Sequence, residues 1–205
     1  DDNLIVRSEK VMLDNVHGRQ KIPGVCIEII DTPQFHRLRS LKQLGLCYYV
    51  YPTACHNRFE HSIGTYHLAN QLLNYLNNNQ SNIEISDNIR KVITIAALCH
   101  DLGHVTFSHL FDDLFLKESD NYLGIHENRS IYLLDSIIKI YNINISEIEL
   151  KIIGELINPS SSTYDTWPQD YKVGDWIFEI VSNSFCHLDV DKFDYLVRDS
   201  QSIGL

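Results

Sequence analysis

The feature that most constrains the fold is a run of apolar residues, Val92 through Cys99, that leads directly into an adjacent histidine and aspartate. The run is apolar almost all round, which predicts a helix buried on every side. Ser86 and Asp87 precede it as a helix start, because a serine at the N-cap accepts hydrogen bonds from first-turn amides. Other helices must cover such a helix, so we expect an all-α domain around it, with this helix ending near Gly103.

Helical spacing of apolar residues, together with capping residues, predicts the surrounding helices. Thr32 followed by Pro33 predicts a helix start, with an apolar face that continues through Leu44 to an end at Gly45. The stretch 25–30 fits either a short strand or a buried turn of helix, and we allow for a short β-hairpin near the N-terminus. Further helices are expected from Asn57, which with Glu60 resembles a capping box, and over about 108–116, 126–141, 146–156, 174–183 and 190–200.

Length and charge restrict the class of protein. The 205 residues suffice for one domain with a proper core, and we treat residues 1–205 as a single domain. The formal net charge of −10 disfavours a protein that grips nucleic acid backbone, because such binding needs a basic surface. It leaves room for a nucleotide ligand, which needs only a local cluster of cations or a metal.

The cysteines and the absence of targeting segments bear on location. The five cysteines are an odd number with no C-x-x-C pair, which argues against a disulfide framework or a structural zinc site. Reduced thiols are typical of intracellular proteins, so we expect a cytoplasmic or nuclear location. No apolar run approaches the roughly 18–20 residues that a membrane span needs, and no signal peptide is recognisable. We therefore expect no membrane association.

A candidate metal site begins with the pair that follows the apolar run. His100 and Asp101, side by side at the end of a buried helix, are costly unless something pairs with them. Imidazole plus carboxylate suits a divalent ion, and His61 and Asp191 are the candidates that would complete the set. Such a mononuclear site would leave positions free for water and a phosphate oxygen, which is the arrangement of a metal-dependent hydrolase.

Each of these residues has a plainer interpretation when taken alone. A histidine on an apolar helix face, such as His61, is more often a hydrogen-bonded core residue than a ligand. Asp191 shares an acidic cluster with Asp189 and Asp194 and could serve as a helix cap. The ten histidines, several of them close to the His-Asp pair, favour the site over these alternatives.

Short segments in series form a pattern more specific than any one of them. They are DTPQFHRLR (31–39), KQLG (42–45), NRFEHSIG (57–64), LCHDLGH (98–104), FSH with FD (107–112) and DVDKFDY (189–195). The series resembles the HD-domain deoxynucleoside triphosphate triphosphohydrolases, most closely their eukaryotic SAM- and HD-domain-containing members. The resemblance runs from about Lys10 to Leu205. It implies an HD-domain helical bundle with a mononuclear metal site.

The resemblance implies roles for the histidines. The metal ligands of such enzymes match His61, His100, Asp101 and Asp191. The histidine that matches His126 protonates the 5′-oxygen leaving group, and His104, His109 and Asp112 match residues beside the phosphates. A proton donor is needed because attack on the α-phosphorus leaves a poor alkoxide. The metal is one divalent ion, compatible with iron, manganese, zinc, nickel or magnesium, and magnesium would accompany the substrate phosphates.

The resemblance also implies a substrate pocket and an activator site. Arg58 and Lys192 match phosphate-binding cations, although single cations more usually pair with surface acids. The residues that surround the sugar and exclude a ribose 2′-hydroxyl match Gln43, Leu44, Tyr195 and Asp199. The residues that bind an activating guanine nucleotide match Lys10, Val11, Asp31 and Arg39. Near that site Leu13 and His36 stand where asparagine and glutamine are usual.

The expected activity is hydrolysis of a deoxynucleoside triphosphate to a deoxynucleoside and intact triphosphate. The relatives continue into a C-terminal lobe, so the chain is expected to be truncated relative to them, and a homo-oligomer stays open. One alternative is an HD phosphohydrolase for nucleoside monophosphates or cyclic nucleotides. Another is a nucleotide-binding regulatory module without turnover. The retained sugar residues speak against the first, and the complete ligand set speaks against the second.

Overall fold

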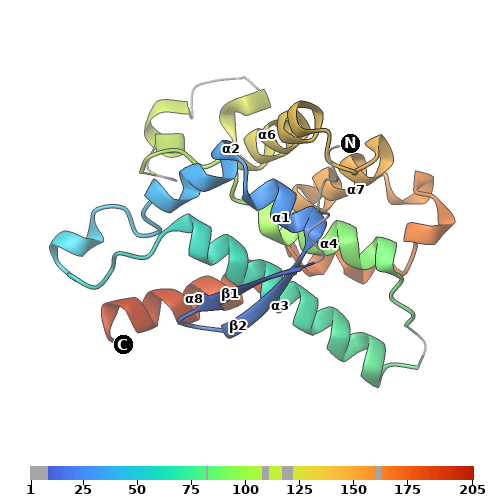
Figure 1. The fold of residues 1–205 in the computed structure, drawn as a ribbon, viewed down its shortest axis with the longest axis horizontal. Helices are drawn as coiled ribbons and strands as arrows, with labels where there is room; N and C mark the ends of the chain where they lie inside the picture. Colours follow the sequence, from blue (N-terminus) through green and yellow to red (C-terminus); the bar gives the residue numbers. More distant parts are fainter. Residues whose placement is uncertain (1–8, 82, 108–110, 117–121, 160–162) are drawn as a thin grey trace, which may run out of the picture.

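One buried helix, α4 (Asp87–Cys99), forms the centre of the protein in the computed structural model, which describes residues 9–81, 83–107, 111–116, 122–159 and 163–205. Every residue from Val92 to Cys99 is buried, as the sequence predicts. Helix α3 (Arg58–Asn79) packs against α4. Helices α6 (His126–Tyr141) and α7 (Glu147–Ile157) also contact α4 (Figure 1). The expectation of a mostly helical domain around this helix is confirmed.

The other elements are short or peripheral. They are β1 (Glu9–Asp14), β2 (Gly18–Pro23), α1 (Gly24–Ile30), α2 (Pro33–His36), η1 (Arg37–Ser40), η2 (Cys47–Tyr49), η3 (Asp112–Leu116), η4 (Tyr122–Gly124), η6 (Tyr164–Thr166), η7 (Gln169–Tyr171), η8 (Asp175–Glu179) and α8 (Val190–Ile203). Helix α8 packs against α3, so three long helices meet near the start of α3. Within the described parts of the chain, no helix has both the length and the apolar character to cross a membrane.

The hairpin allowed for near the N-terminus is present. Strands β1 and β2 pair antiparallel, with Glu9 opposite Pro23 and Asp14 opposite Gly18. The stretch 25–30, which periodicity left open, lies in helix α1, where four residues are buried. Figure 1 shows the hairpin beside α3 and α8, and its turn therefore lies within reach of the start of α8.

Side chains cap the helices where the sequence predicts. The side chains of Thr32, Asn57 and Ser86 each accept a hydrogen bond from the amide three residues on, at 3.3, 3.2 and 3.3 Å. Ser146 and Glu149 form a reciprocal capping box. A cap of this kind contributes about 1 kcal/mol. The cap at Asn57 also fixes the first turn of α3, which carries a candidate metal ligand.

The helix expected from Pro33 to Leu44 is wrong in its second half. Helix α2 and the turn η1 end at Ser40, and the chain then becomes extended. The reason is tertiary. The amide of Gln43 donates to the carbonyl of His56 at 3.1 Å, and the amide of Arg58 donates to that of Leu41 at 2.9 Å. Backbone groups that a helix would have used are paired instead with the segment before α3.

Two other helix predictions need correction. In place of a helix over 174–183, only η8 forms. The side chain of Asn183 makes hydrogen bonds to the backbone of Phe185, Cys186 and Leu188 at 3.0–3.1 Å, and these bonds stabilise a loop there instead. The expected helix over 108–116 is described only from residue 111, and residues 112–116 form a π-helical turn. Residues 108–110 lie outside the described part of the chain.

Candidate metal centre and its cavity

Three helices bring the four candidate ligands to one point. His61 lies in the first turn of α3, His100 and Asp101 follow the end of α4, and Asp191 lies in the first turn of α8. Nε2 of His61 is 2.9 Å from Oδ1 of Asp191 and 3.5 Å from Oδ2 of Asp101. Nε2 of His100 is 3.4 Å from that Asp191 oxygen and 3.5 Å from Oδ1 of Asp101. Residues separated by up to 130 positions therefore share one small volume.

Hydrogen bonds set the tautomers of the two histidines. Nδ1 of His61 is 2.7 Å from Oδ2 of Asp194, and Nδ1 of His100 is 2.8 Å from the carbonyl oxygen of Ala97. Because these oxygens only accept, each Nδ1 carries the proton, and Nε2 of the neutral ring carries a lone pair. Both Nε2 atoms are buried and make no hydrogen bond to any described residue.

These donor atoms fit a metal ion. Ligand atoms of His61, His100 and Asp101 all lie within 4.8 Å of one another, and Asp191 closes the group. Buried imidazole nitrogens left without a hydrogen bond are costly unless another partner takes their lone pairs. Two such nitrogens facing two carboxylates are a donor set for one divalent ion.

The electrostatics of the group point the same way. Burial opposes protonation of His61, but the carboxylates of Asp191 and Asp194 outweigh it and raise the pKa of His61 to about 10. Burial also opposes ionisation of the two carboxyls. It is outweighed by Arg58 at Asp101 and by His100 at Asp191, so the pKa of each carboxyl lies well below its usual range. The carboxylates therefore stay charged, and a cation would replace the imidazole proton.

The alternative reading of Asp191 as a helix cap is not what the structure has. Asp189 is the N-cap of α8, and its side chain accepts a hydrogen bond from the amide of Lys192 at 2.9 Å. Asp191 therefore has its carboxylate available for the two histidines. Its side chain is 37% exposed, whereas the other three candidate ligands are almost fully buried.

A buried network behind His61 was not predicted. The carboxylate of Asp194 accepts from Nδ1 of His61, from Nε2 of His17 at 2.6 Å, and from Nε and Nη2 of Arg198, both at 2.9 Å. Arg198 in turn donates to both carboxylate oxygens of Asp14 at 2.8 and 2.9 Å. The hairpin is thus tied to a candidate ligand through two carboxylates and one guanidinium.

A glycine makes this network possible. A Cβ on Gly64 would lie 1.9 Å from Oδ1 of Asp194 and 2.5 Å from Nη2 of Arg198. The signal available in the sequence was the spacing of Asp191, Asp194 and Arg198, which places them along one face of a helix. No local signal connects them to Asp14 and His17, which lie more than 170 positions away.

A cavity of about 420 Å³ opens beside the two carboxylates. Every residue that lines it is one that the sequence assigned to the metal, the substrate or catalysis. They are Gln43, Leu44, Arg58, Asp101, His126, Asp191, Tyr195 and Asp199. Inside it a guanidinium nitrogen of Arg58 donates to Oδ2 of Asp101, so a buried cation and the metal-facing carboxylates adjoin the same space.

His126 lies against a second histidine and two carboxylates. Its ring stacks on that of His104, with centroids 4.0 Å apart. Nδ1 of His126 is 3.4 Å from Glu127 and 3.6 Å from Oδ2 of Asp112, whose other oxygen accepts from Arg129 at 2.5 Å. Burial lowers the pKa of His104 to about 4, so that ring is neutral at neutral pH.

Three described residues that were predicted to lie beside the phosphates do not line the cavity: Lys192, His104 and Asp112. Lys192 lies beside Asp191 on α8 but is not among the residues that line the cavity. His109 lies outside the described residues.

A second cavity, of about 450 Å³, is lined by two of the four residues matched to an activator site. Lys10 and Arg39 line it, and Lys10 pairs with Asp31 at 3.1 Å between Nζ and Oδ1. The guanidinium carbon of Arg39 lies 3.5 Å from the centroid of the Phe59 ring. Val11, which lies between the lining residues Lys10 and Met12 on β1, is 41% exposed and does not line the cavity.

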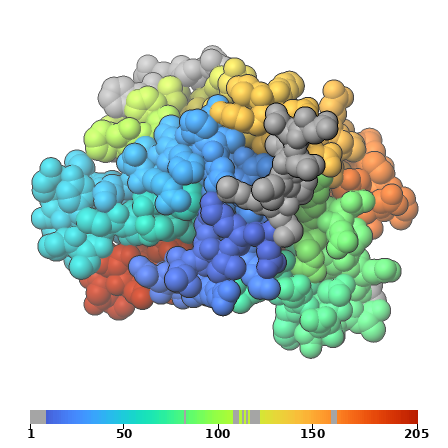
Figure 2. Space-filling model, viewed as in Figure 1, coloured from blue at the N-terminus to red at the C-terminus, as the bar shows by residue number. Residues whose placement is uncertain are grey.

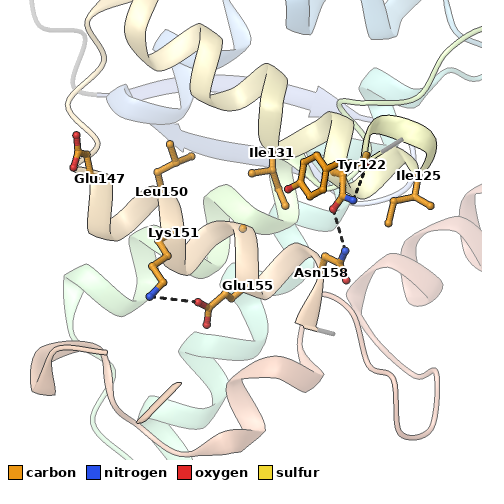
Figure 3. Close-up of a pocket in the computed structure, with 10 residues that line it drawn as sticks. Tyr122, Ile125, Ile131, Glu147, Leu150, Lys151, Glu155 and Asn158 are labelled. Carbon is orange, nitrogen blue, oxygen red and sulfur yellow. Dashed lines mark hydrogen bonds and ion pairs between the residues drawn. The ribbon is translucent and has the colours of Figure 1, made fainter. Parts of the chain in front are cut away.

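A further cavity, of about 530 Å³ and so larger than the two above, lies between α6 and α7 (Figure 3). Four of its polar side chains are paired: Lys151 with Glu155 at 3.9 Å, and Asn158 with Asn128 at 3.1 Å. None of the predicted site residues lines it, so size alone does not make it the functional site.

Comparison with known proteins finds one matching family and several similar proteins that are longer than this chain. A family model described as HD domain matches residues 58–174. The deoxynucleoside triphosphate triphosphohydrolase SAMHD1 homolog of Dictyostelium discoideum is 39% identical over 199 residues, which cover 97% of this chain and 37% of that protein. Human deoxynucleoside triphosphate triphosphohydrolase SAMHD1 is 38% identical over 216 residues, covering 98% and 34%. A putative HD domain-containing protein, L394, of Acanthamoeba polyphaga mimivirus is 39% identical, covering 93% and 42%. The chain thus spans about a third of the length of the triphosphohydrolases that it matches.

Proposed function

The chain belongs to the HD-domain family, and from this membership we propose that it is a metal-dependent phosphohydrolase that splits deoxynucleoside triphosphates into deoxynucleoside and intact triphosphate. The observation that carries the proposal is the 420 Å³ cavity. Metal-facing carboxylates, a buried guanidinium, a histidine, and a wall of apolar and polar side chains line that one space. These are the groups that hydrolysis of a nucleotide phosphoester requires.

We assign the metal to His61, His100, Asp101 and Asp191, and residues 1–205 to one HD domain. When bound, a divalent ion in this set supplies a nucleophilic water near neutral pH and offsets charge on phosphate oxygens. The donor types leave iron, manganese, zinc, nickel and magnesium open. Magnesium would also accompany the substrate phosphates.

The protein's own residues supply charge and a proton. Arg58, buried at the cavity wall, opposes the negative charge that develops on the phosphate oxygens. His126 protonates the 5′-oxygen as it leaves, since an alkoxide is a poor leaving group. Asp112 lies beside His126, with its Oδ2 3.6 Å from Nδ1. We assign Lys192, His104 and His109 to the phosphate region, with His104 acting as a neutral ring.

The part of the cavity wall that faces the proposed sugar position favours a deoxyribose. Leu44 and Tyr195 present apolar surface, while Gln43 and Asp199 offer polar atoms to a sugar hydroxyl. A close wall rejects an extra 2′-hydroxyl, because a hydroxyl buried without a partner is unfavourable. The names of the relatives from Dictyostelium and human support the same substrate class.

The second cavity suggests an activator. Two cations, Lys10 and Arg39, and an aromatic ring at Phe59 suit a phosphorylated base, and we propose a guanine nucleotide there, contacted also by Val11 and Asp31. We further propose a homo-oligomer and an intracellular location, cytoplasmic or nuclear. The five free thiols support the location.

Two other functions remain as alternatives. An HD phosphohydrolase for nucleoside monophosphates or cyclic nucleotides would use the same metal centre. The match of the sugar-facing residues to those of dNTP triphosphohydrolases favours the triphosphate instead. A nucleotide-binding module without turnover would not need His126 beside Asp112 and the metal-facing carboxylates.

Product analysis decides among them. The purified chain is incubated with each dNTP, each NTP, a monophosphate and a cyclic nucleotide, with Mn²⁺ or Mg²⁺ and with or without GTP. Deoxynucleoside plus triphosphate, from dNTPs only, is the expected result, and Asp101→Ala should abolish both turnover and bound metal. Release of phosphate from monophosphates would replace the proposal by the first alternative. Nucleotide binding with metal present but no product would replace it by the second.

A further inference from the structure

His56 occupies a position that neither the metal site nor the predicted substrate residues explain. Its side chain is 5% exposed, and its Nε2 lies 2.6 Å from Oδ1 of Asp199, on α8. Its backbone carbonyl accepts from the amide of Gln43. Asp199 and Gln43 both line the 420 Å³ cavity, so His56 makes hydrogen bonds to two of the residues that form it.

The contacts around His56 join two segments that would otherwise be separate. Lys42 pairs with Asn57 in a β-bridge, which places residues 41–43 against residues 56–58. The hydroxyl of Thr53 donates to the carbonyl of Ser202, which fastens the same loop to the end of α8. Figure 2 shows the loop that precedes α3, in cyan, against the C-terminal helix, in red. Among the described residues, His56 makes this connection through the side chain of Asp199, which lines the cavity.

We propose that His56 is a positioning residue that selects for a sugar hydroxyl by holding the Asp199 carboxylate in one orientation. The proposal rests on the deoxynucleotide substrate proposed above. Nε2–H of His56 donates to Oδ1, and Oδ2 makes no hydrogen bond to a described residue. In a deoxynucleotide the only free sugar hydroxyl is the 3′-hydroxyl, and Oδ2 is the atom that accepts from it.

The chemistry of His56 fits a fixed donor. Nδ1 is buried and has no hydrogen-bond partner among the described residues. The Asp199 oxygen that faces Nε2 only accepts hydrogen bonds, so Nε2 carries a proton and is the donor. A carboxylate held by one such bond cannot rotate freely, and the orientation of its second oxygen is set before the ligand arrives.

A comparison of two ligand analogues tests the proposal. The probes are analogues of a dNTP and of the matching 2′,3′-dideoxy nucleotide, which lacks the 3′-hydroxyl. In both, a methylene group replaces the 5′-oxygen, so the bond that the proposed reaction breaks is absent. Binding of both is measured by calorimetry to the full chain with Mn²⁺. The variants are His56→Phe, which keeps a ring but removes the donor, and His56→Gln, which restores a donor. Thr53→Val is the matched control, because it loosens the same loop without touching Asp199.

The wild type should bind the dNTP analogue about tenfold more tightly than the dideoxy analogue, the ratio expected for one hydrogen bond to a charged group. His56→Phe should bring that ratio close to one, His56→Gln should recover it in part, and Thr53→Val should leave it unchanged. Equal weakening of both analogues in His56→Phe, or an unchanged ratio, would overturn the proposal and make His56 a structural residue.

The same data separate this inference from the proposed function. A wild type that hydrolyses dNTPs but binds both analogues equally loses only the role of His56. A wild type that neither hydrolyses nor binds any dNTP refutes the proposed substrate, and the role of His56 with it. Thermal unfolding of each variant shows whether the fold is retained, and His56→Gln supplies the reading if the phenylalanine variant does not fold.

Discussion

Replacing Asp194 by asparagine should weaken metal binding at His61 without removing a proposed ligand. Asp194 is fully buried, and its two oxygens accept from His61, His17 and twice from Arg198. An asparagine has one acceptor oxygen and turns its NH₂ group toward donors on the other side. His61 then loses the charged partner that sets its tautomer and its ring orientation.

The size of the effect follows from these contacts. Loss of a partner that orients a ligating histidine typically reduces metal affinity 10–100-fold, or about 1.4–2.8 kcal/mol. Breaking a buried ion pair typically costs about 3–5 kcal/mol of folding free energy. Arg198 keeps two hydrogen bonds to Asp14 in the variant, so the destabilisation should lie near the lower end, about 3 kcal/mol.

Metal affinity is measured by competition with a chromophoric chelator, and stability by urea unfolding of the metal-free chain. Asp135→Asn is the control. Among the described residues, Asp135 pairs only with the largely exposed Lys139 on α6, so this substitution should change neither quantity. At saturating metal the variant should still turn over. An affinity within twofold of the wild type would refute the view that Asp194 supports the metal site.

Three further predictions follow from the same geometry. His126→Ala should retain stoichiometric metal but lose about 10²–10⁴-fold in turnover, the usual contribution of a positioned acid, and an unchanged rate would remove His126 from catalysis. Gly64→Ala should lower the melting temperature by more than about 5 °C, because its Cβ would meet Oδ1 of Asp194 at 1.9 Å; an unshifted melting curve would contradict the close approach of α3 and α8. In the metal-free chain the raised pKa of His61, about 10, stabilises the fold fully below about pH 6.5, and this contribution should fall as pH rises toward 10. Urea unfolding across that range should therefore show the metal-free chain losing a few kcal/mol while the metal-loaded chain, with a neutral His61, loses less.

Local patterns account for what the sequence predicted well. The apolar run before His100 could only be a buried helix, and Ser86, Asn57 and Ser146 mark helix starts through hydrogen bonds made within a few residues. The series of short motifs that resembles the HD-domain triphosphohydrolases then identified the residues that line the 420 Å³ cavity. These predictions needed no knowledge of which segments pack together.

The misses share a physical cause, which is pairing between distant segments. The helix after Pro33 stops at Ser40 because Gln43 finds its backbone partner at His56. The partners of Asp194 on the hairpin, and the bond between His56 and Asp199, join residues more than 140 positions apart. Such contacts leave no periodic trace in a single sequence, so they become visible only when the chain is folded.

The most direct test of the central claim is hydrolysis of a dNTP in ¹⁸O-labelled water by the metal-loaded chain, with products separated and weighed by mass spectrometry. Attack of water on the α-phosphorus, with His126 protonating the departing 5′-oxygen, predicts one ¹⁸O atom in the triphosphate and none in the deoxynucleoside. Label in the deoxynucleoside, or release of pyrophosphate and a monophosphate, would contradict the account.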